Sequence, residues 1–485
     1  MQEKGRPEAG SNASQSSHEI REMDRIFEAQ KKAFARNPMP SAHERIGHLK
    51  QLKKALIQHR EPIIAAIHAD YSCRAGDETL LGELLPSVEG LSFAIRRIRK
   101  WMKPDHRRAG MLFQPAKARI LYQPKGVVGV IVPWNYPLYL LIGPLTGALA
   151  AGNRVMIKTS RRAPEIGKAV QKMIRKVFDE GHVAVLTGQG GLGSAFIEKP
   201  WDHLMFTGST AVGREVMRAA ADHLTPVTLE LGGKSPAIIG PRMPMPDAAE
   251  RIVFGKQFNV GQTCVAPDYV LCPQERVREF VEAFQNGVAR MVPAMAANPQ
   301  YTSMIDSRAH ERLTSLLEDA RARGARVLEV NPSHESFRGT RKLPLYLLLD
   351  VTDDMQVMQE EIFGPVLPVI PYQGLKHAAA YVNSRPRPLA LYFFDYQREN
   401  IAFILMHTHS GGALINDTLM HVAQDDLPFG GIGDSGMGSY HGREGFVTFS
   451  HAKGVMIRPK FNSASFINPP YGKWVHRLVY RLFVR

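Results

Sequence analysis

Cysteine is scarce in this chain: Cys73, Cys264 and Cys272 are the only three in 485 residues. They form no CxxC pair, and none lies with histidines at the spacing of a metal site. An odd number of cysteines without such pairs argues against zinc and iron–sulfur centres and fits a reducing compartment. We therefore expect a cytoplasmic protein that binds no metal.

Long apolar runs are also absent. The longest candidate, PLYLLIGPLTGALAAG at 137–152, is interrupted by Pro144 and by three glycines. It falls short of the about 20 residues that a membrane-spanning helix needs, so it predicts a buried helix instead. Residues 1–18 are polar and lack the apolar segment of a signal peptide, and we expect a disordered lead-in there.

The formal net charge of +15 is not accompanied by a nucleic-acid motif. The densest basic group surrounds Ile95 and Ile98, which would face inward on a helix. No aromatic RNA-binding pattern or zinc finger lies nearby, so a solvated helix face is the better interpretation and no nucleic-acid partner is expected. The group consists of Arg96, Arg97, Arg99, Lys100, Lys103, Arg107 and Arg108.

Strand and helix patterns alternate along most of the chain. Helical periodicity dominates 20–103, and ARILYQPKGVVGVIVP at 118–133 then predicts a pair of strands. Strand patterns beginning at 154, 182 and 203 are each followed by a helix pattern. This rhythm is typical of a parallel sheet covered by helices, and a second one begins after 231. The sequence therefore predicts an α/β protein with two domains.

Two polar side chains stand where predicted strands end. Asn135 follows a buried-type strand in the loop PWNYP, where its amide could donate a hydrogen bond into a cleft or could simply serve the turn. Glu230 lies between two leucines in LELGGKSP. An apolar setting raises the pKa of a carboxyl group and suits a general base, although a paired structural carboxylate is the alternative.

The cysteines differ in their surroundings. Cys264, in FNVGQTCVAP, is expected at an exposed turn where backbone dipoles stabilise a thiolate, yet its local sequence alone favours an inert core residue. Cys272, in the apolar strand YVLCP, is expected in the core, and Cys73 lies in a loop with no base beside it. The turn in FTGSTAVG, between Gly208 and Gly213, could face a pyrophosphate, although it lacks the GxGxxG pattern.

Six motifs together resemble the aldehyde dehydrogenase superfamily. They are PWNYP (133–137), FTGST (206–210), LELGGKSP (229–236), GQTC (261–264), EEIFGPV (360–366) and PFGGIGDSG (428–436), in the order of that family. The resemblance covers residues 20–460 and implies a thiol mechanism. Cys264 would attack the aldehyde carbon, the Asn135 side chain and the Cys264 amide would bind the oxyanion, and Glu230 would activate the water that hydrolyses the thioester.

The resemblance also implies an NAD or NADP cofactor. Glu361 would hold the nicotinamide ribose with Phe363 beside it, and Lys158 would contact the adenosine ribose. The residues it assigns to the cofactor are Trp134, Lys158, Gly208, Ser209, Gly213, Leu231, Glu361 and Phe363.

One position departs from the family pattern. The family usually has Lys-Pro-Ser-Glu after this strand, whereas this chain has Lys158, Thr159, Ser160 and Arg161. A carboxylate there disfavours a ribose 2′-phosphate and an arginine favours one, so NADP use is expected. The alternative is that Arg161 points into solvent and NAD still binds.

The last third resembles the class 3 branch, and bacterial coniferyl aldehyde dehydrogenases in particular. This similarity implies an aromatic or medium-chain aldehyde as substrate and a homodimer. A relative that passes the thioester to coenzyme A, and a catalytically silent binding or structural protein, remain alternatives. Glu230 argues against the first, and the presence of Cys264 and Asn135 argues against the second.

The C-terminal sequence KWVHRLVYRLFVR has an amphipathic pattern. Basic residues recur every four positions from Lys473 to Arg485, opposite an apolar face that includes Trp474 and Leu482. Such a helix could lie on a membrane surface, or it could dock on the protein body or a partner subunit.

Five segments are expected along the chain. They are a lead-in (1–18), a Rossmann-like NAD(P)-binding domain (19–231) with a β-hairpin arm near 112–124, a catalytic thiol domain (232–410), a return to the cofactor domain with the oligomerisation arm (411–460), and a basic amphipathic tail (461–485).

Overall fold

Five buried strands form a parallel sheet in the first half of the chain. In the computed structural model, which describes residues 9–188, 191–460 and 463–484, the strand order of this sheet is β15-β7-β6-β3-β4-β5, with only β15 antiparallel. The strands are β3 (Val127–Ile131), β4 (Arg154–Lys158), β5 (Val183–Leu186), β6 (His203–Thr207), β7 (Val227–Glu230) and β15 (Gly436–Met437).

The chain changes direction within this sheet between β3 and β6. Strands β4 and β5 continue to one side of β3, whereas β6 and β7 continue to the other. In doubly wound sheets, ligands bind at this switch, outside the carboxyl ends of the strands. The loops that begin at Val132 and Gly208 leave the sheet there.

Helices cover both faces of the sheet, and one of them is apolar on every side. This helix, α6, is buried along almost its whole length, so the buried helix expected at 137–152 is confirmed. The exposed side of α5 carries Arg96, Arg97, Arg99 and Lys100, as expected for a solvated face. The helices of this lobe are α1 (Ala9–Arg36), α2 (Ala42–Gln58), α3 (Arg60–Tyr71), α4 (Gly76–Thr79), α5 (Leu85–Trp101), α6 (Tyr139–Ala151), α7 (Pro164–Arg175), α8 (Leu192–Ile197), α9 (Thr210–Ala221) and α16 (Gly442–Thr448).

The N-terminal helix starts earlier than expected. Helix α1 already begins at Ala9, so the expectation of disorder is wrong for residues 9–18, and residues 1–8 lie outside the described residues. The helix is held by Phe27, whose ring packs edge-on against Trp201 with centroids 5.0 Å apart, and by Gln30, which donates to the carbonyl of Val155 at 3.0 Å. The polar residues near position 15 therefore belong to the first turns of a helix whose later turns pack against the protein.

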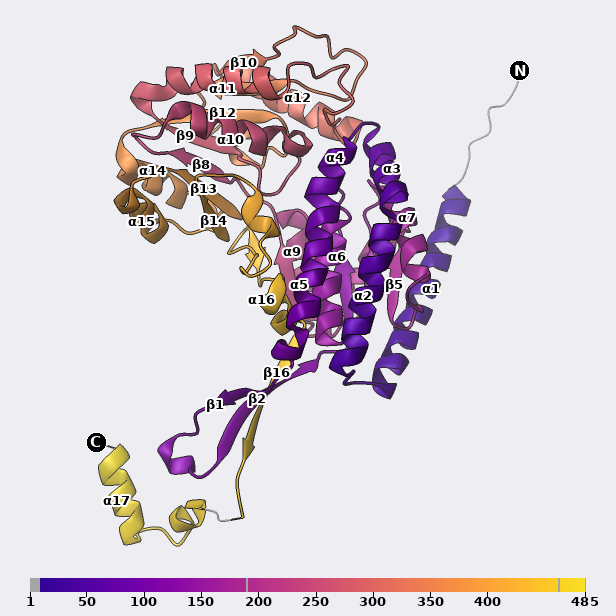
Figure 1. The fold of residues 1–485 in the computed structure, drawn as a ribbon, viewed down its shortest axis with the longest axis vertical. Helices are drawn as coiled ribbons and strands as arrows, with labels where there is room; N and C mark the ends of the chain where they lie inside the picture. Colours follow the sequence, from indigo (N-terminus) through magenta and orange to yellow (C-terminus); the bar gives the residue numbers. More distant parts are fainter. Residues whose placement is uncertain (1–8, 189–190, 461–462, 485) are drawn as a thin grey trace.

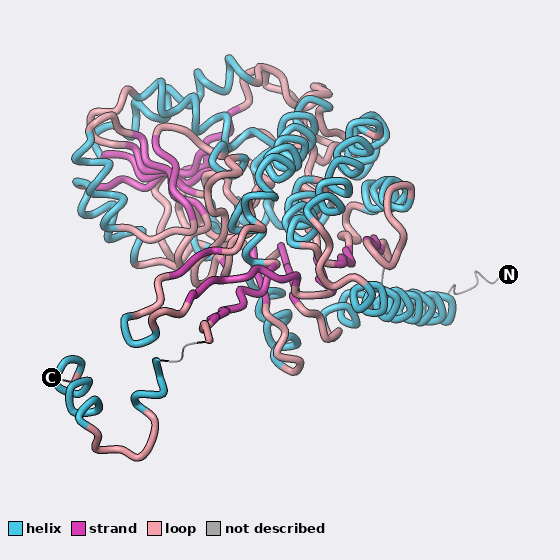
Figure 2. The backbone as a smooth tube through the Cα atoms, turned by 60° about the horizontal axis from the view of Figure 1, so that its bottom comes forward, coloured by secondary structure: helices cyan, strands magenta, loops and turns pink. Residues whose placement is uncertain are grey.

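The second sheet has seven strands in the order β10-β11-β12-β9-β8-β13-β14, parallel except for β10. Figure 2 shows these strands side by side within a ring of helices. Cys272 is fully buried in β9, as expected. The strands are β8 (Pro236–Ile239), β9 (Tyr269–Pro273), β10 (Arg326–Val330), β11 (Leu345–Leu349), β12 (Val366–Tyr372), β13 (Ala390–Phe394) and β14 (Gly412–Ile415), and the helices are α10 (Met245–Gln257), α11 (Val277–Met291), α12 (Ser307–Ala322), α13 (Gln356–Gln359), α14 (Gly374–Asn383) and α15 (Arg398–His407).

The return to the first sheet comes later than the sequence suggested. Strand β14 still pairs with β13 of the seven-stranded sheet, so a boundary at 411 is wrong. The chain rejoins the first sheet only at β15, where Gly436 pairs with Glu230. Strand β14 has only four residues, Gly412–Ile415, so it gives little periodic pattern from which its sheet could be assigned.

An arm extends below both lobes in Figure 1. It is a three-stranded antiparallel sheet of β1 (Asp105–Arg107), β2 (Lys117–Pro124) and β16 (Ser450–Ile457). The strand pair expected within 118–133 does not form, because β2 joins the arm whereas β3 joins the first sheet. The expected hairpin near 112–124 is therefore one half of a sheet completed by a strand more than 300 residues later.

The basic tail forms a helix, α17 (Trp474–Phe483), at the far end of the arm (Figure 1). Trp474, Leu478, Leu482 and Phe483 are exposed. Among the described residues, no helix is long and apolar enough to cross a membrane.

Candidate functional site

A cleft of about 760 Å³ lies at the switch of the first sheet, facing the second lobe. Three residues predicted to take part in the chemistry line this cleft together: Cys264, Glu230 and Asn135. Six residues assigned to the cofactor line it as well: Trp134, Gly208, Ser209, Leu231, Glu361 and Phe363.

Two predicted cofactor residues do not line this cleft. Gly213 lies beneath it in α9, where a Cβ would come within 2.6 Å of the Leu231 side chain, so its lack of a side chain lets α9 approach. Lys158 ends β4, and its Nζ donates to the carbonyl of Thr159 at 2.9 Å. Gly213 therefore supports the wall from behind, whereas Lys158 lies at the carboxyl end of an interior strand, outside the lining of the cleft.

The segment before Cys264 has a strained backbone. Asn259, Val260 and Gly261 have φ angles of 50°, 52° and 70°, a conformation that costs a β-branched residue such as valine dearly. A Cβ on Gly261 would lie 2.5 Å from the carbonyl oxygen of Gly364, which requires glycine there. The strain turns the chain sharply and aims the Cys264 side chain into the cleft.

Cys264 lies in a turn, as expected, and lines the cleft with its side chain half-buried. Burial raises the pKa of the thiol, and the carboxyl groups of Glu361 and Glu230 raise it further. The backbone N–H groups of Cys264 and Val265 point at the sulfur and lower the pKa, but less than burial raises it. The expected stabilisation of a thiolate by backbone dipoles is therefore present but outweighed, and the resting group is a neutral thiol.

Glu230, at the end of β7, is buried. Desolvation raises its pKa well above the usual value, opposed only by the backbone N–H of Gly431. Neither carboxyl oxygen has a hydrogen-bond partner of ordinary geometry among the described residues. An unpaired carboxyl group facing a cleft is suited to exchange a proton with a bound molecule, and the alternative of a paired structural carboxylate is wrong.

On the other side of the cleft, the carboxyl group of Glu361 packs against a glycine. A Cβ on Gly232 would lie 2.0 Å from Oε2 of Glu361, so only glycine fits beside this carboxyl group. Burial and the charge of Asp268 raise the pKa of Glu361 to about 8. Its Oε1 has no hydrogen-bond partner in the described part of the chain, which leaves an acceptor for a hydroxyl group such as that of a ribose.

An arginine that the sequence did not single out crosses the cleft. Arg162 forms a two-point ion pair with Asp306, with N–O distances of 2.7 and 2.8 Å, and its guanidinium lies 4.4 Å from the centre of the Trp134 ring. Asp306 also caps α12 by accepting from Ala309. Arg162 thus links the first lobe to the second, and no local signal distinguishes it from Arg161.

Burial lowers the pKa of Lys158, and the charge of Arg161, which is exposed at the rim, lowers it further. A carboxylate from α1, Glu19, opposes that effect on Lys158. The same carboxylate lies 2.3 Å from where a Cβ on Gly188 would stand, at the end of β5. The rim of the cleft therefore carries two cations, Lys158 and Arg161, and one carboxylate, Glu19. Glu19 belongs to α1, and the sequence had predicted a disordered segment up to the residue before it.

Comparisons with known proteins agree with this geometry. A model of the aldehyde dehydrogenase family matches residues 9–455. The chain belongs to the aldehyde dehydrogenase family. It is 56% identical to a protein of Pseudomonas aeruginosa named "Probable coniferyl aldehyde dehydrogenase", over 97% of this chain and 98% of the relative. It is 36% identical to aldehyde dehydrogenase family 3 member A2 of Macaca fascicularis, over 90% of this chain and 88% of that relative.

A solved structure confirms the fold. The substrate-bound state of Staphylococcus aureus AldH superposes with a TM-score of 0.89 at 34% identity, covering 96% of this chain and 99% of that one. The α/β fold and the likeness to class 3 enzymes are thus confirmed, and the chain is an NAD(P)-dependent oxidoreductase acting on aldehydes. The residues present fit such a cofactor: an unpartnered acceptor on Glu361, the glycine turn before α9 and the cations at the rim.

The raised pKa of the Cys264 thiol makes a testable prediction. In the cofactor-free protein, alkylation of Cys264 by iodoacetamide should accelerate with pH and show no plateau up to about pH 9.5, above the ordinary thiol pKa near 8.5. Glu361→Gln removes a group that is charged only above its raised pKa of about 8, so alkylation should become faster above that pH and change little below it. Peptide mass spectrometry reports both rates, with Cys73 as the internal reference. A plateau below about pH 8 would contradict the buried neutral thiol.

Proposed function

We propose that Cys264 is the nucleophile and that the Asn135 side chain and the Cys264 amide bind the oxyanion. The observation that carries this proposal is the convergence of Cys264, Asn135 and Glu230 in one cleft. Once the Cys264 thiol has released its proton to solvent, attack of the thiolate on the aldehyde carbon forms a thiohemiacetal oxyanion, which the two donors stabilise. The cofactor, when bound, accepts the hydride from this carbon.

Glu230 acts after the thioester has formed. Its carboxylate takes a proton from the water that attacks the thioester, and the carboxylic acid leaves. Burial favours the protonated form in the resting site, so Glu230 must first lose that proton, and its carboxylate is then a stronger base than a solvated one. Transfer of the thioester to coenzyme A is the second candidate, and the buried base beside the nucleophile disfavours it.

An aromatic aldehyde such as coniferyl aldehyde is the proposed substrate, with medium-chain aliphatic aldehydes as the alternative. The proposal is supported by 56% identity, over nearly the whole chain, to a relative whose name contains that substrate.

NADP is proposed as an accepted and preferred cofactor. Lys158 and Arg161 place two cations at the rim, where the family usually has one lysine and one glutamate. A 2′-phosphate could pair with both. Glu19 on the same rim opposes such an anion, which keeps NAD competitive.

A cytoplasmic homodimer with peripheral membrane contact through 473–485 is the proposed state of the protein. The exposed apolar residues of α17 and the exposed charges of Lys473, Arg477 and Arg481 support that contact, and Arg485 lies outside the described residues. These features are the ones that interfacial helices share.

Steady-state oxidation of coniferyl aldehyde and of hexanal tests the chemistry. Cys264→Ala should abolish turnover of both, and Asn135→Ala should lower kcat/KM by roughly 10² to 10³. Glu230→Gln should give one burst of reduced cofactor followed by slow turnover, because the thioester forms but is not hydrolysed. Cys73→Ala is the matched control and should retain activity. Turnover that requires added coenzyme A would instead identify an acylating enzyme, and full activity of Cys264→Ala would refute the thiol mechanism.

Cofactor preference is tested at Arg161. Arg161→Gln should raise KM for NADP about tenfold with little change for NAD, since one charge-assisted contact is worth about 1.5–3 kcal/mol before solvent screening at this exposed rim weakens it. Arg308→Gln, at another exposed arginine of the cleft, controls for the loss of charge. Equal changes for both cofactors, or in both variants, would exclude a specific 2′-phosphate contact.

Membrane contact is tested by co-sedimentation with anionic liposomes. The full chain should sediment with the vesicles, and a form ending at Gly472 should not. Neutral liposomes are the control, because the charges of the tail should not be attracted to them. Equal sedimentation of the two forms would show that the tail does not bind membrane.

A further inference from the structure

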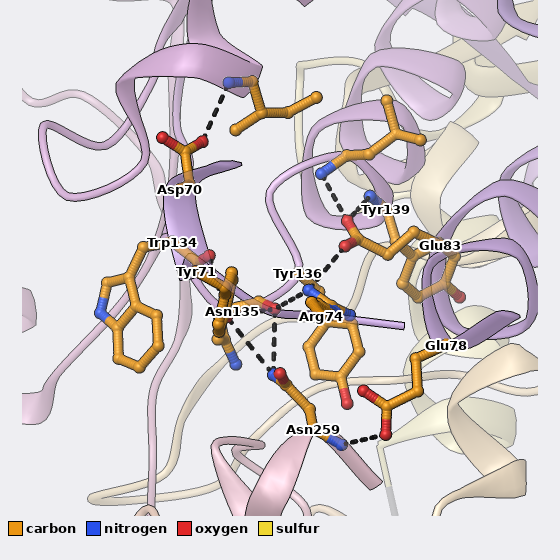
Figure 3. A network of polar contacts seen from close by, with 12 residues as sticks. Asp70, Tyr71, Arg74, Glu78, Glu83, Trp134, Asn135, Tyr136, Tyr139 and Asn259 are labelled. Carbon is orange, nitrogen blue, oxygen red and sulfur yellow. Dashed lines mark hydrogen bonds and ion pairs between the residues drawn. The ribbon is translucent and has the colours of Figure 1, made fainter. Parts of the chain in front are cut away.

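The backbone carbonyl of Asn135 is held by three donors from two segments that are distant in the sequence (Figure 3). It accepts from the Tyr71 hydroxyl at 3.2 Å, from Nη1 of Arg74 at 3.0 Å and from Nδ2 of Asn259 at 3.2 Å. The direction of this carbonyl fixes the peptide plane that follows Asn135. Three donors on one oxygen therefore restrict the residue whose side chain is proposed to bind the oxyanion.

Arg74 is the charged member of this group, and it is buried. Its Nη1 lies 3.0 Å from Oε1 of Glu83. The guanidinium lies between two aromatic rings, 5.2 Å from the centre of Tyr71 and 5.0 Å from that of Tyr136. Within the described chain, its Nε and Nη2 have no hydrogen-bond partner, so Nη1 makes both polar contacts.

Glu83 extends the connection to the far end of the same loop. It lies in a π-helical turn, Leu80–Leu84, of the kind that often re-aims a side chain at a functional site. Its Oε2 accepts from the backbone N–H of Leu138 at 2.7 Å and of Tyr139 at 3.3 Å, where α6 begins. Arg74 thus contacts Asn135 directly and, through Glu83, the end of the same loop where α6 begins.

The third donor connects the nucleophile to this loop. Nδ2 of Asn259 also donates to the carbonyl of Gln262 at 3.1 Å, two residues before Cys264. The backbone N–H of Asn259 donates to Glu78 at 3.1 Å. Residues of the segment 71–83 therefore contact both the loop that carries Asn135 and the turn that precedes Cys264.

We propose that Arg74 is a positioning residue, which sets the Asn135 amide relative to the Cys264 sulfur through the Asn135 carbonyl. This inference rests on the proposed oxyanion role of Asn135. Removing Arg74 alone leaves the Glu83 carboxyl group buried without its counter-charge, which lowers stability, so only a loss of activity that depends on Asn135 reports positioning. What an apolar side chain cannot supply is a donor aimed at this carbonyl.

A double-mutant cycle tests the proposal in the full-length enzyme. Arg74→Met should lower kcat/KM for aldehyde by roughly 10², mainly through kcat, and leave KM for the cofactor within about twofold. In the Asn135→Ala background the same substitution should cost less than about twofold, because the side chain it positions is gone. Arg74→Lys, which keeps one charged donor, should recover part of the activity.

Arg45 provides a matched control. It is also buried and donates to the carbonyls of Ala150 and Ala151, at the opposite end of α6. Arg45→Met should lower thermal stability without a comparable loss of kcat/KM. Its remaining effect should be the same with and without Asn135→Ala.

The outcomes separate this inference from the function on which it rests. Losses that multiply in Arg74→Met with Asn135→Ala would overturn the positioning role and leave Asn135 intact as an oxyanion donor. No loss in Asn135→Ala alone would overturn both. If Arg74→Met does not fold, the same cycle with Tyr71→Phe removes one donor from the same carbonyl and keeps the buried charge, and additivity there would also refute the proposal.

Discussion

The hydrogen bond from Asn259 to the carbonyl of Asn135 joins the two lobes at the point where chemistry is proposed. Asn135 belongs to the loop after β3, whereas Asn259 follows α10 of the second lobe. Because each loop is fixed by its own sheet, this contact sets the distance between oxyanion donor and nucleophile. The left-handed backbone at 259–261 is maintained because the side chain of Asn259 is occupied on both sides of the turn.

The cleft is also an electrostatic unit. Burial raises the pKa of Cys264, Glu230 and Glu361 together, so the resting site holds protons that a solvent-exposed site would have lost. Each negative charge that forms raises the pKa of the remaining two. Any positive charge bound in the cleft lowers all three at once. Activation of the thiol and binding of a cationic group are therefore coupled by the geometry, without any movement of the chain.

Much of this site was predictable from the sequence because it lies where strands end. Asn135, Glu230 and the turn at Gly208 all follow buried strands of one parallel sheet, and parallel strands deliver their carboxyl ends to one edge. The residues next to Cys264 did not indicate a catalytic role. That role was predicted only because the other motifs of the family occur in the same chain and in the family's order.

The supporting residues could not have been found in the same way. Arg74, Glu78 and Glu83 lie in a helical region with no motif, and their partners are 55 to 181 residues distant. The sheet partner of β2 and the membership of β14 were missed for the same reason, since pairing between distant strands leaves no local pattern. Local chemistry therefore predicts which groups react, whereas non-local packing decides how accurately they are aimed.

The arm bears on both the proposed dimer and the proposed membrane contact, and each of them limits the other. Exposed apolar side chains of the arm lie on the turn at Met111–Phe113, on the last residues of β16 (Met456 and Ile457) and on α17, all within the arm and tail that extend away from the two lobes in Figure 1. A partner subunit that covers this part of the protein would remove from water the side chains that a membrane would otherwise take up. The proposed dimer and the proposed membrane contact can coexist only if the partner leaves the apolar face of α17 uncovered. Dimer contacts along the strand edges of the arm, rather than at its tip, satisfy that condition.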